Sequence, residues 1–191
     1  MTLLALIRHM PTAWNAAGRL QGRHDSALDP DTEPKWRLPP ELAEFRFLSS
    51  PLDRALTTAK RLGVTVEPDL RLTEMSWGEW EGRTLAELRA ELGAAMGDLE
   101  ANGLDFRAPG GESPRDVQSR VMPLLAEIAA AGRPTAAITH KGVIRANLAL
   151  ATDWDMLGKP PHRLSWSAAH LFRLDPAGHP AVERLNIPLE M

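Results

Sequence analysis

The chain has 191 residues, of which 43% are hydrophobic and 25% charged, as is usual for one globular domain with a sizeable core. The formal net charge of −3 gives no overall attraction for nucleic acid, and the absence of cysteine excludes disulfides, thiolate nucleophiles and cysteine-based zinc sites. The first apolar segment, residues 3–7, is too short for a signal peptide or a membrane span, so we expect a cytoplasmic protein without nucleic-acid or membrane partners.

Two strand signals lie in the first third of the chain, and each leads into basic residues. Residues 3–7 are apolar and run directly into Arg8 and His9. Residues 45–50 form the second such segment, and Arg54 follows four residues later. Both segments predict buried strands that end at a basic side chain.

Helical patterns follow the strand signals and fill the segments between them. One helix is expected over about residues 52–62, with Ser50 as its cap, Pro51 at the first position and a stop at Gly63. A second is expected over residues 85–100, opened by a capping-box pair at Thr84 and Glu87. Two more are expected over residues 113–131, ended by Gly132, and over residues 143–151.

The last third of the chain continues the alternation of strands and helices. Residues 135–139 form a third apolar segment that runs into His140, and residues 169–174 and 181–185 predict late strands. The alternation favours a three-layer α/β/α fold with a mainly parallel central sheet. We expect residues 1–191 to form a single domain, with a helical cap or side segment at about residues 83–109.

The three strand ends are predicted to converge. In an open α/β sheet the ligand site lies outside the carboxyl ends of the parallel strands, so Arg8, His9, Arg54 and His140 are expected in one crevice. Such a cluster repels itself unless an anion with several oxygens, such as a phosphoryl group, lies between its members. A small phosphorylated substrate is therefore expected in this crevice.

The segment around the first strand end also carries a recognisable signature. LIRHMPTAWN, residues 6–15, followed by GRLQG, residues 18–22, resembles the signature of the histidine phosphatase superfamily, the phosphoglycerate-mutase-like proteins. Met10 stands where that signature usually has Gly, and Pro11 where Glu is frequent. Family-like blocks follow in family order: SSPLDRA at 49–55, LTEMSWGEWEG at 72–82, GES at 111–113 and THKGVIRA at 139–146.

The resemblance implies a role for each matching residue. His9 would be the nucleophile that accepts the phosphoryl group, and Arg8, Arg54 and His140 would bind the phosphoryl oxygens. His9 must then react as a neutral imidazole, whereas His140 is expected to stay protonated. Glu74 would be the general acid for the leaving oxygen. The cluster supplies its own positive charge, so no metal and no cofactor are expected.

Further residues of the matching blocks are expected at the mouth of the site. Asn15, Gln21 and Trp77 would contact the phosphate or the leaving group, while the backbone amides of Lys141 and Gly142, at a helix start, could donate to an oxyanion.

Several alternatives stay open at the level of the sequence. Glu79 and Glu81 compete with Glu74 as the acid, since all three lie near one turn. The sequence does not identify the leaving group of the substrate or the oligomeric state, for which a homodimer is one option. The phosphatase branch is favoured over a cofactor-dependent phosphoglycerate mutase because the chain has no Tyr and the segment 87–107 carries few cations. The replacement of Gly by Met10 also leaves open a non-catalytic phosphate-binding protein.

Overall fold

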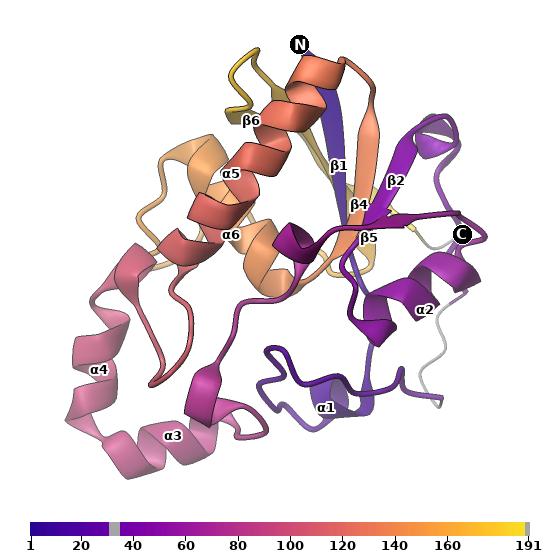
Figure 1. The fold of residues 1–191 in the computed structure, drawn as a ribbon. Coiled ribbons are helices and arrows are strands. Elements are labelled where there is room, and N and C mark those ends of the chain that lie inside the picture. The colour runs from indigo at the N-terminus through magenta and orange to yellow at the C-terminus, as the bar shows by residue number, and fades with distance from the viewer. Residues whose placement is uncertain (31–34, 190–191) are drawn as a thin grey trace.

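The computed structural model describes residues 1–30 and 35–189, and a six-stranded sheet forms its centre (Figure 1). The strands are β1 (Thr2–Arg8), β2 (Arg46–Ser49), β3 (Glu67–Pro68), β4 (Thr135–Thr139), β5 (Ala168–Leu174) and β6 (Pro180–Pro188). Their order across the sheet is β3-β2-β4-β1-β5-β6. The first four run parallel, and β5 and β6 pair antiparallel, so the predicted mainly parallel sheet is confirmed.

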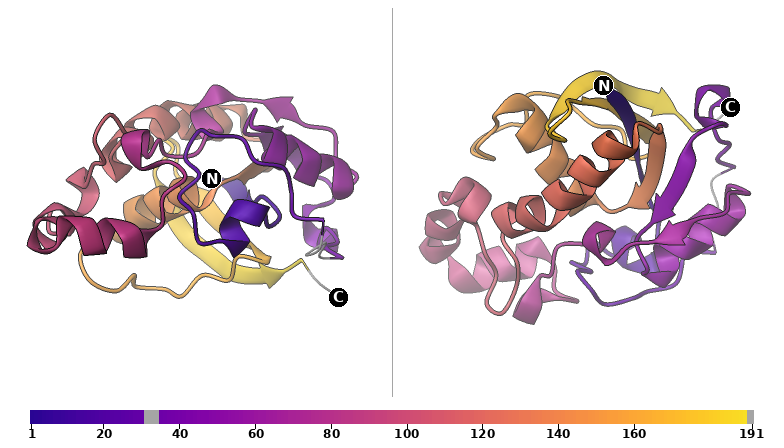
Figure 2. Two further views of the ribbon diagram at one scale, coloured as in Figure 1. Left: turned by 90° about the horizontal axis from the view of Figure 1, so that it is seen from below. Right: turned by 45° about the horizontal axis from the view of Figure 1, so that its top comes forward.

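Helices cover both faces of this sheet, as the views in Figure 2 show. The α-helices are α1 (Ala13–Ala16), α2 (Asp53–Arg61), α3 (Leu85–Leu92), α4 (Ala94–Glu100), α5 (Pro114–Ala131) and α6 (Lys141–Thr152). Short 3-10 turns lie at Pro40–Leu42, Leu70–Leu72, Gly78–Trp80 and Gly103–Asp105.

Two hydrophobic cores follow from the alternation of side chains along the strands. Leu4 and Leu6 of β1 point to the face covered by α5 and α6, whereas Ala5 and Ile7 point to the face covered by α2. All four are almost fully buried. A central strand that is apolar on both faces is typical of a sheet covered on both sides, which confirms the three-layer α/β/α prediction.

Two predicted helices differ in detail from the structure. The helix expected over residues 85–100 is divided at Gly93, whose φ of 54° is unfavourable for other residues and ends α3. The helix expected at residue 52 begins at Asp53, with Leu52 in the capping position. Ser50 does not cap it through the first turn; its Oγ accepts from the Leu52 amide at 3.3 Å and contacts His140.

The start of α5 tests how much a local cap contributes to this fold. Ser113 and Asp116 form a reciprocal capping box, with bonds of 3.2 and 2.9 Å between each side chain and the other's amide. Ser113→Ala removes one acceptor at a buried helix start, so the free energy of unfolding should fall by about 1 kcal/mol. For a domain of this size, the midpoint of thermal unfolding should fall by about 2–4 °C.

Ser119→Ala on the same helix is the matched control. Its hydroxyl is exposed and donates only to the Arg115 carbonyl one turn earlier, so its loss should change the unfolding midpoint little. Equal shifts in the two variants would contradict a specific contribution from the cap.

Candidate active site

His9 is the first residue after β1 and lies at the carboxyl edge of the sheet. Its side chain is 4% exposed, and its Nδ1 lies 2.7 Å from the backbone oxygen of Met10. Because a carbonyl oxygen only accepts, Nδ1 carries the hydrogen and Nε2 keeps a lone pair. Burial and the charges of Arg8 and Arg54 hold the pKa of His9 well below its ordinary value. The imidazole is therefore neutral near pH 7 and fit to attack through Nε2.

Met10 occupies its position without backbone strain, although the family signature has glycine there. It is not among the residues with positive φ, and its side chain packs in the core beside Ile7 and Ala55. Its amide donates to Thr58 Oγ1 at 2.9 Å, and that hydroxyl donates to the Arg54 carbonyl at 2.7 Å. Thr58 thus ties the residue after His9 to the first turns of α2.

Arg54 is fully buried at the start of α2. Its two terminal nitrogens donate to the carbonyls of His24 and Gly22, each at 2.7 Å, and one of them also lies 3.3 Å from Asp25. Burial lowers the pKa of the guanidinium, and the nearby Glu74 and Asp25 charges oppose that shift. The 22–25 loop therefore fixes the orientation of Arg54.

Two buried guanidinium donors around His9, Nε of Arg8 and Nε of Arg54, have no hydrogen-bond partner among the described residues. Nδ1 of His140 also has no partner there, and it can donate only when it carries a hydrogen. Arg8 also lies with its guanidinium carbon 5.5 Å from the centre of the Trp166 ring, in a cation–π contact. Buried donors are rarely left unbonded, so the two guanidinium donors indicate a site built for the oxygens of an anion.

The surroundings of His140 bear on its protonation state. Its ring is fully buried, 5.1 Å from that of His9 between centroids, and its Nε2 lies 2.8 Å from Ser50 Oγ. Burial is the main cause that holds the pKa of His140 well below its ordinary value, and the charges of its neighbours add to this effect. Burial beside two arginines thus favours a neutral His140 in the unliganded site, and its protonation around a transferring phosphoryl group stays a prediction.

Glu74 lies in the same site and is held by backbone amides. Its Oε1 accepts from the Met75 amide at 2.8 Å, and Oε1 and Oε2 accept from the Gly142 amide at 3.0 and 3.2 Å. Burial nevertheless raises the pKa of this carboxyl above its ordinary value. The Gly142 amide is therefore bonded to Glu74 in this structure, and its donation to a substrate oxyanion stays a prediction.

The two competing carboxylates lie elsewhere. Glu79 is exposed, and neither it nor Glu81 lines the cavity that contains Glu74. Glu81 instead accepts from the amides of Arg23 and His24, each at 3.0 Å. It therefore holds the loop whose carbonyls bind Arg54.

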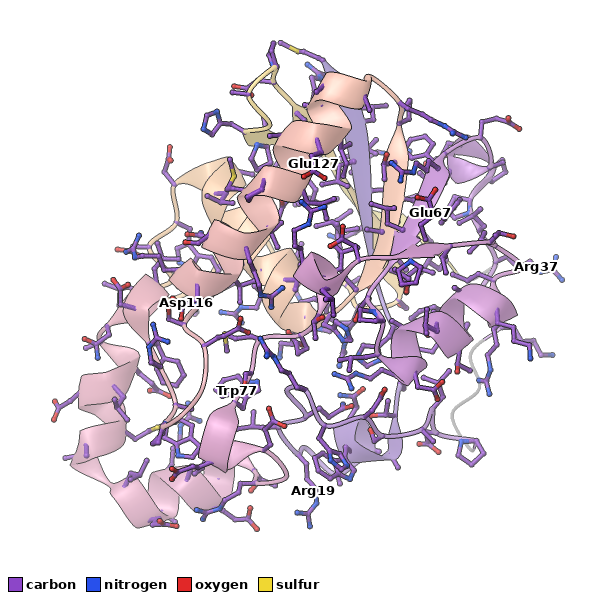
Figure 3. The ribbon with its side chains drawn as sticks, viewed as in Figure 1. Arg19, Arg37, Glu67, Trp77, Asp116 and Glu127 are labelled. Atoms are coloured by element: carbon purple, nitrogen blue, oxygen red, sulfur yellow. The ribbon has the colours of Figure 1, made fainter. Side chains whose placement is uncertain are left out.

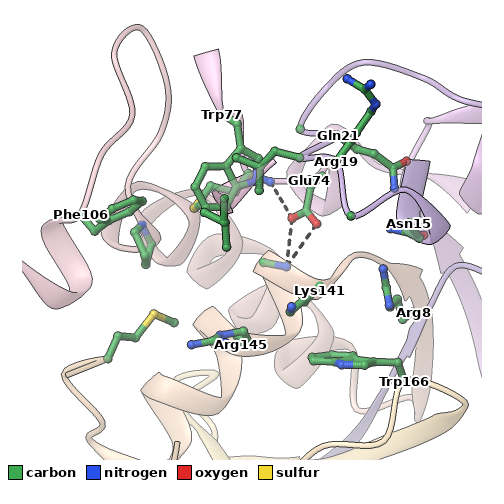
Figure 4. Close-up of a pocket in the computed structure, with 18 of the residues that line it drawn as sticks. Arg8, Asn15, Arg19, Gln21, Glu74, Trp77, Phe106, Lys141, Arg145 and Trp166 are labelled. Atoms are coloured by element: carbon green, nitrogen blue, oxygen red, sulfur yellow. Dashed lines mark hydrogen bonds between the residues drawn. The ribbon is translucent and has the colours of Figure 1, made fainter. Parts of the chain in front are cut away.

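These residues open into one cavity of about 780 Å³ at the carboxyl end of the sheet (Figure 4). The predicted site residues in its wall are Arg8, His9, Arg54, Glu74, Asn15, Gln21, Trp77, Lys141 and Gly142. His140 is not in the wall. Trp77 and Arg19 can be followed at this end of the molecule in Figure 3.

Several wall residues were not singled out from the sequence. They are Arg19, Leu20, Leu85, Arg89, Met96, Glu100, Phe106, Arg145, Met156 and Trp166, among others. Arg145 lies in the THKGVIRA block, four residues after Lys141, so helical spacing could have placed both on one face. Trp166 has no local signal, because only the chain fold brings its loop to Arg8.

The described parts of the chain also bear on metals and membranes. In residues 1–30 and 35–189 no three or more His, Cys, Asp or Glu side chains are placed to hold a metal ion together. Within the same ranges, no helix combines the length and apolarity needed to cross a membrane.

Comparison with known proteins identifies the family. Residues 4–188 match the model of the histidine phosphatase superfamily, branch 1. A glucosyl-3-phosphoglycerate phosphatase of Mycolicibacterium vanbaalenii is 37% identical over 179 residues, covering 81% of this chain and 78% of that protein. A probable phosphoglycerate mutase, GpmB, of Salmonella paratyphi C is 34% identical over 134 residues, covering 66% of this chain and 62% of that protein.

Solved structures share the fold over almost the whole chain. Bacillus stearothermophilus YhfR superposes with a TM-score of 0.82 at 28% identity, covering 100% of this chain and 98% of that one. The mycobacterial glucosyl-3-phosphoglycerate phosphatase in complex with VO3 superposes with a TM-score of 0.76 at 25% identity, covering 98% and 100%.

The phosphatase match extends over more of the chain than the mutase match and at higher identity. The chain therefore belongs to branch 1 of the histidine phosphatase superfamily and is a phosphoric monoester hydrolase of that type.

Proposed function

We propose that the protein hydrolyses a small phosphate monoester through a phosphohistidine on His9, without a metal ion. The observation that carries this proposal is that burial shifts the pKa values of His9 and Glu74, two groups of one cavity, in opposite directions. Burial keeps His9 free of its proton and favours the protonated form of Glu74. These are the directions that a neutral nucleophile and a protonated general acid require.

In the first step, Nε2 of His9 attacks phosphorus and the bond to the ester oxygen breaks. Glu74 donates its proton to that oxygen, so the leaving group departs as an alcohol. The hydrogen on Nδ1 stays on the ring and is donated in a hydrogen bond to the Met10 carbonyl oxygen. This bond stabilises the positive charge of the phosphorylated imidazole. Arg8 and Arg54 bind the three equatorial oxygens, over which the charge is spread in the transition state.

In the second step, the Glu74 carboxylate removes a proton from water as the water oxygen attacks phosphorus. The phosphorus–nitrogen bond breaks, inorganic phosphate leaves, and both His9 and Glu74 return to their starting states. A bound phosphoryl dianion opposes the charges that depress the pKa of His140. His140 accordingly becomes protonated in the complex and stabilises the transferring group.

The features expected of a phosphoglycerate mutase are weak in this chain. The two cations of segment 87–107 are engaged within the protein, Arg89 with Glu100 at 2.7 Å and Arg107 with Asp116 at 2.6 Å. Neither is left free to bind a second negative group. The name of the mycobacterial relatives makes glucosyl-3-phosphoglycerate one candidate substrate. The cytoplasmic location, the single domain with its helical side segment and the homodimer stay predictions.

The nucleophile can be tested by trapping. Labelled substrate mixed with enzyme and quenched rapidly in base should leave a base-stable, acid-labile adduct on His9, because a phosphorus–nitrogen bond survives alkali but not acid. His9→Ala should lose about 10⁴-fold or more in turnover, as for a residue that carries the covalent intermediate. Label on a serine, an aspartate or His140, or normal turnover by His9→Ala, would show that the assignment is wrong.

The acid can be tested through the leaving group and pH. Glu74→Gln should lower the phosphorylation rate about 10²- to 10⁴-fold with an alkyl phosphate, and much less with an aryl phosphate that departs without a proton. Since the pKa of Glu74 is raised, the wild-type phosphorylation rate should fall only as pH rises through that raised value. This alkaline decrease should vanish in Glu74→Gln. Single-turnover kinetics isolate the step, because water attack also needs Glu74.

Glu79→Gln is the matched control and should retain the wild-type profile, since that side chain is exposed and outside the cavity. Glu81→Gln should lower activity equally for alkyl and aryl phosphates, because Glu81 acts through the loop that positions Arg54. A loss that depends on the leaving group in either variant, with none in Glu74→Gln, would place the acid on another carboxylate.

The source of positive charge can be tested with chelators and oxyanions. Hydrolysis should survive EDTA, because the arginines supply the charge, and orthovanadate should inhibit competitively by occupying the same donors. Activity lost in EDTA and restored by a divalent ion would overturn the metal-free mechanism. Mutase activity that appears with 2,3-bisphosphoglycerate and exceeds hydrolysis would move the protein to the mutase class.

A further inference from the structure

The cavity holds more positive charge than a single phosphoryl group requires. Its wall contains six cationic side chains and two carboxylates, whereas the whole chain has a formal net charge of −3. The cations are Arg8, Arg19, Arg54, Arg89, Lys141 and Arg145, and the carboxylates are Glu74 and Glu100. Cations are thus concentrated here against the overall charge, which indicates a substrate more anionic than a simple monoester.

The cations of the wall differ in how they are neutralised. Arg54 pairs with Asp25, Arg89 pairs with Glu100, and Arg19 donates to the Gly82 carbonyl. Lys141 and Arg145 form no ion pair with any of the described residues. Burial lowers the pKa of both, and for Arg145 no neighbouring carboxylate opposes that effect. Their charge is therefore available to a ligand.

The positions of Lys141 and Arg145 reduce the stability of α6, the helix that carries them. Lys141 is the first residue of α6 and Arg145 lies one turn later, so two like charges face each other at i and i+4. Both also lie near the amino end of the helix, where the helix dipole disfavours positive charge. A local cost without local compensation is typical of residues kept for binding.

Aromatic rings hold both cations in place. The Lys141 ammonium lies 5.6 Å from the centre of the Trp166 ring, which also contacts Arg8, and the Arg145 guanidinium carbon lies 5.1 Å from the centre of the Trp154 ring. Figure 4 shows Lys141 and Arg145 extending from α6 towards the cavity. Cation–π contacts orient a side chain without neutralising its charge.

The pair lies beside the proposed general acid. Gly142, which follows Lys141 on α6, donates its amide to both oxygens of Glu74. Since Glu74 faces the oxygen of the leaving group in the proposed mechanism, Lys141 and Arg145 border the leaving group. Lys141 shares the Trp166 ring with Arg8, and Arg145 lies one turn further along α6.

We propose that Lys141 and Arg145 form a second anion subsite, which binds a carboxylate or a second phosphate on the leaving group of the substrate. The inference rests on the proposed phosphatase function and extends it to a substrate class: phosphate monoesters with a second anionic group close to the ester oxygen. Arg145 then determines specificity, because its planar guanidinium can bind two oxygens of such a group at once.

Three substrates with the same three-carbon skeleton separate the sources of the second charge. 3-Phosphoglycerate carries a carboxylate, propane-1,3-diol bisphosphate carries a second phosphate, and glycerol 3-phosphate carries a neutral hydroxyl. Wild-type enzyme should hydrolyse at least one of the first two with kcat/KM about 10-fold or more above that for glycerol 3-phosphate. The anion preferred identifies the group that the subsite takes.

Arg145→Met should reduce kcat/KM for the preferred dianionic substrate about 10- to 100-fold, the usual effect of losing a hydrogen bond to a charged group. Its kcat/KM for glycerol 3-phosphate should stay within about 3-fold of wild type, which also shows that the variant folds. Arg145→Lys should restore part of the loss. Arg163→Met, an exposed arginine outside the cavity, removes the same charge and should leave the substrate preference unchanged.

Two results would overturn the inference while leaving the phosphatase function in place. One is a wild-type enzyme that hydrolyses all three substrates without preference. The other is an Arg145→Met variant that loses activity equally on charged and neutral substrates. Failure to hydrolyse any of them, or p-nitrophenyl phosphate, with no adduct on His9, would instead overturn the proposed function and this inference with it.

Discussion

The organisation of the site depends on positive charge buried at the carboxyl ends of three parallel strands. β2, β4 and β1 are parallel neighbours in the sheet, so the residues at their carboxyl ends lie close together. Arg8 and Arg54 are thereby brought close to two imidazoles in a region with little water. Carbonyl groups of the 22–25 loop hold Arg54, and Asp25 at 3.3 Å and Glu74 supply opposing charge.

Burial then assigns different protonation states to the acid and the nucleophile. Loss of water disfavours the charged form of every group, which means the cation of an imidazole and the anion of a carboxyl. The same environment therefore lowers the pKa of His9 and His140 and raises that of Glu74. The packing therefore favours the neutral histidine and the protonated carboxyl that the proposed mechanism requires.

Helix α6 links this chemistry to the choice of substrate. Its first turn places the Gly142 amide under Glu74 and the Lys141 side chain at the cavity, and the next turn adds Arg145. A shift of α6 would thus change the acid and the proposed second anion subsite together.

Local sequence signals determined most of the secondary structure and the identity of the phosphoryl-binding cluster. Apolar segments predicted β1, β2 and β4, and the pairs Thr84–Glu87 and Ser113–Asp116 sit where α3 and α5 begin, because strand burial and helix capping depend on residues close in the chain. The matching blocks also indicated His9, Arg8, Arg54 and Glu74 as wall residues.

The tertiary structure decided what those residues contact and which charge they carry. The hydrogen bond from the Gly142 amide to Glu74 joins residues 68 positions apart, and the contact of Trp166 with Arg8 joins a distant loop to the end of β1. The neutral state of His140 likewise depends on desolvation by the whole fold. The burial of a residue, its distance to other charges and the shape of the cavity all depend on residues far apart in the sequence, so only the folded chain determines them.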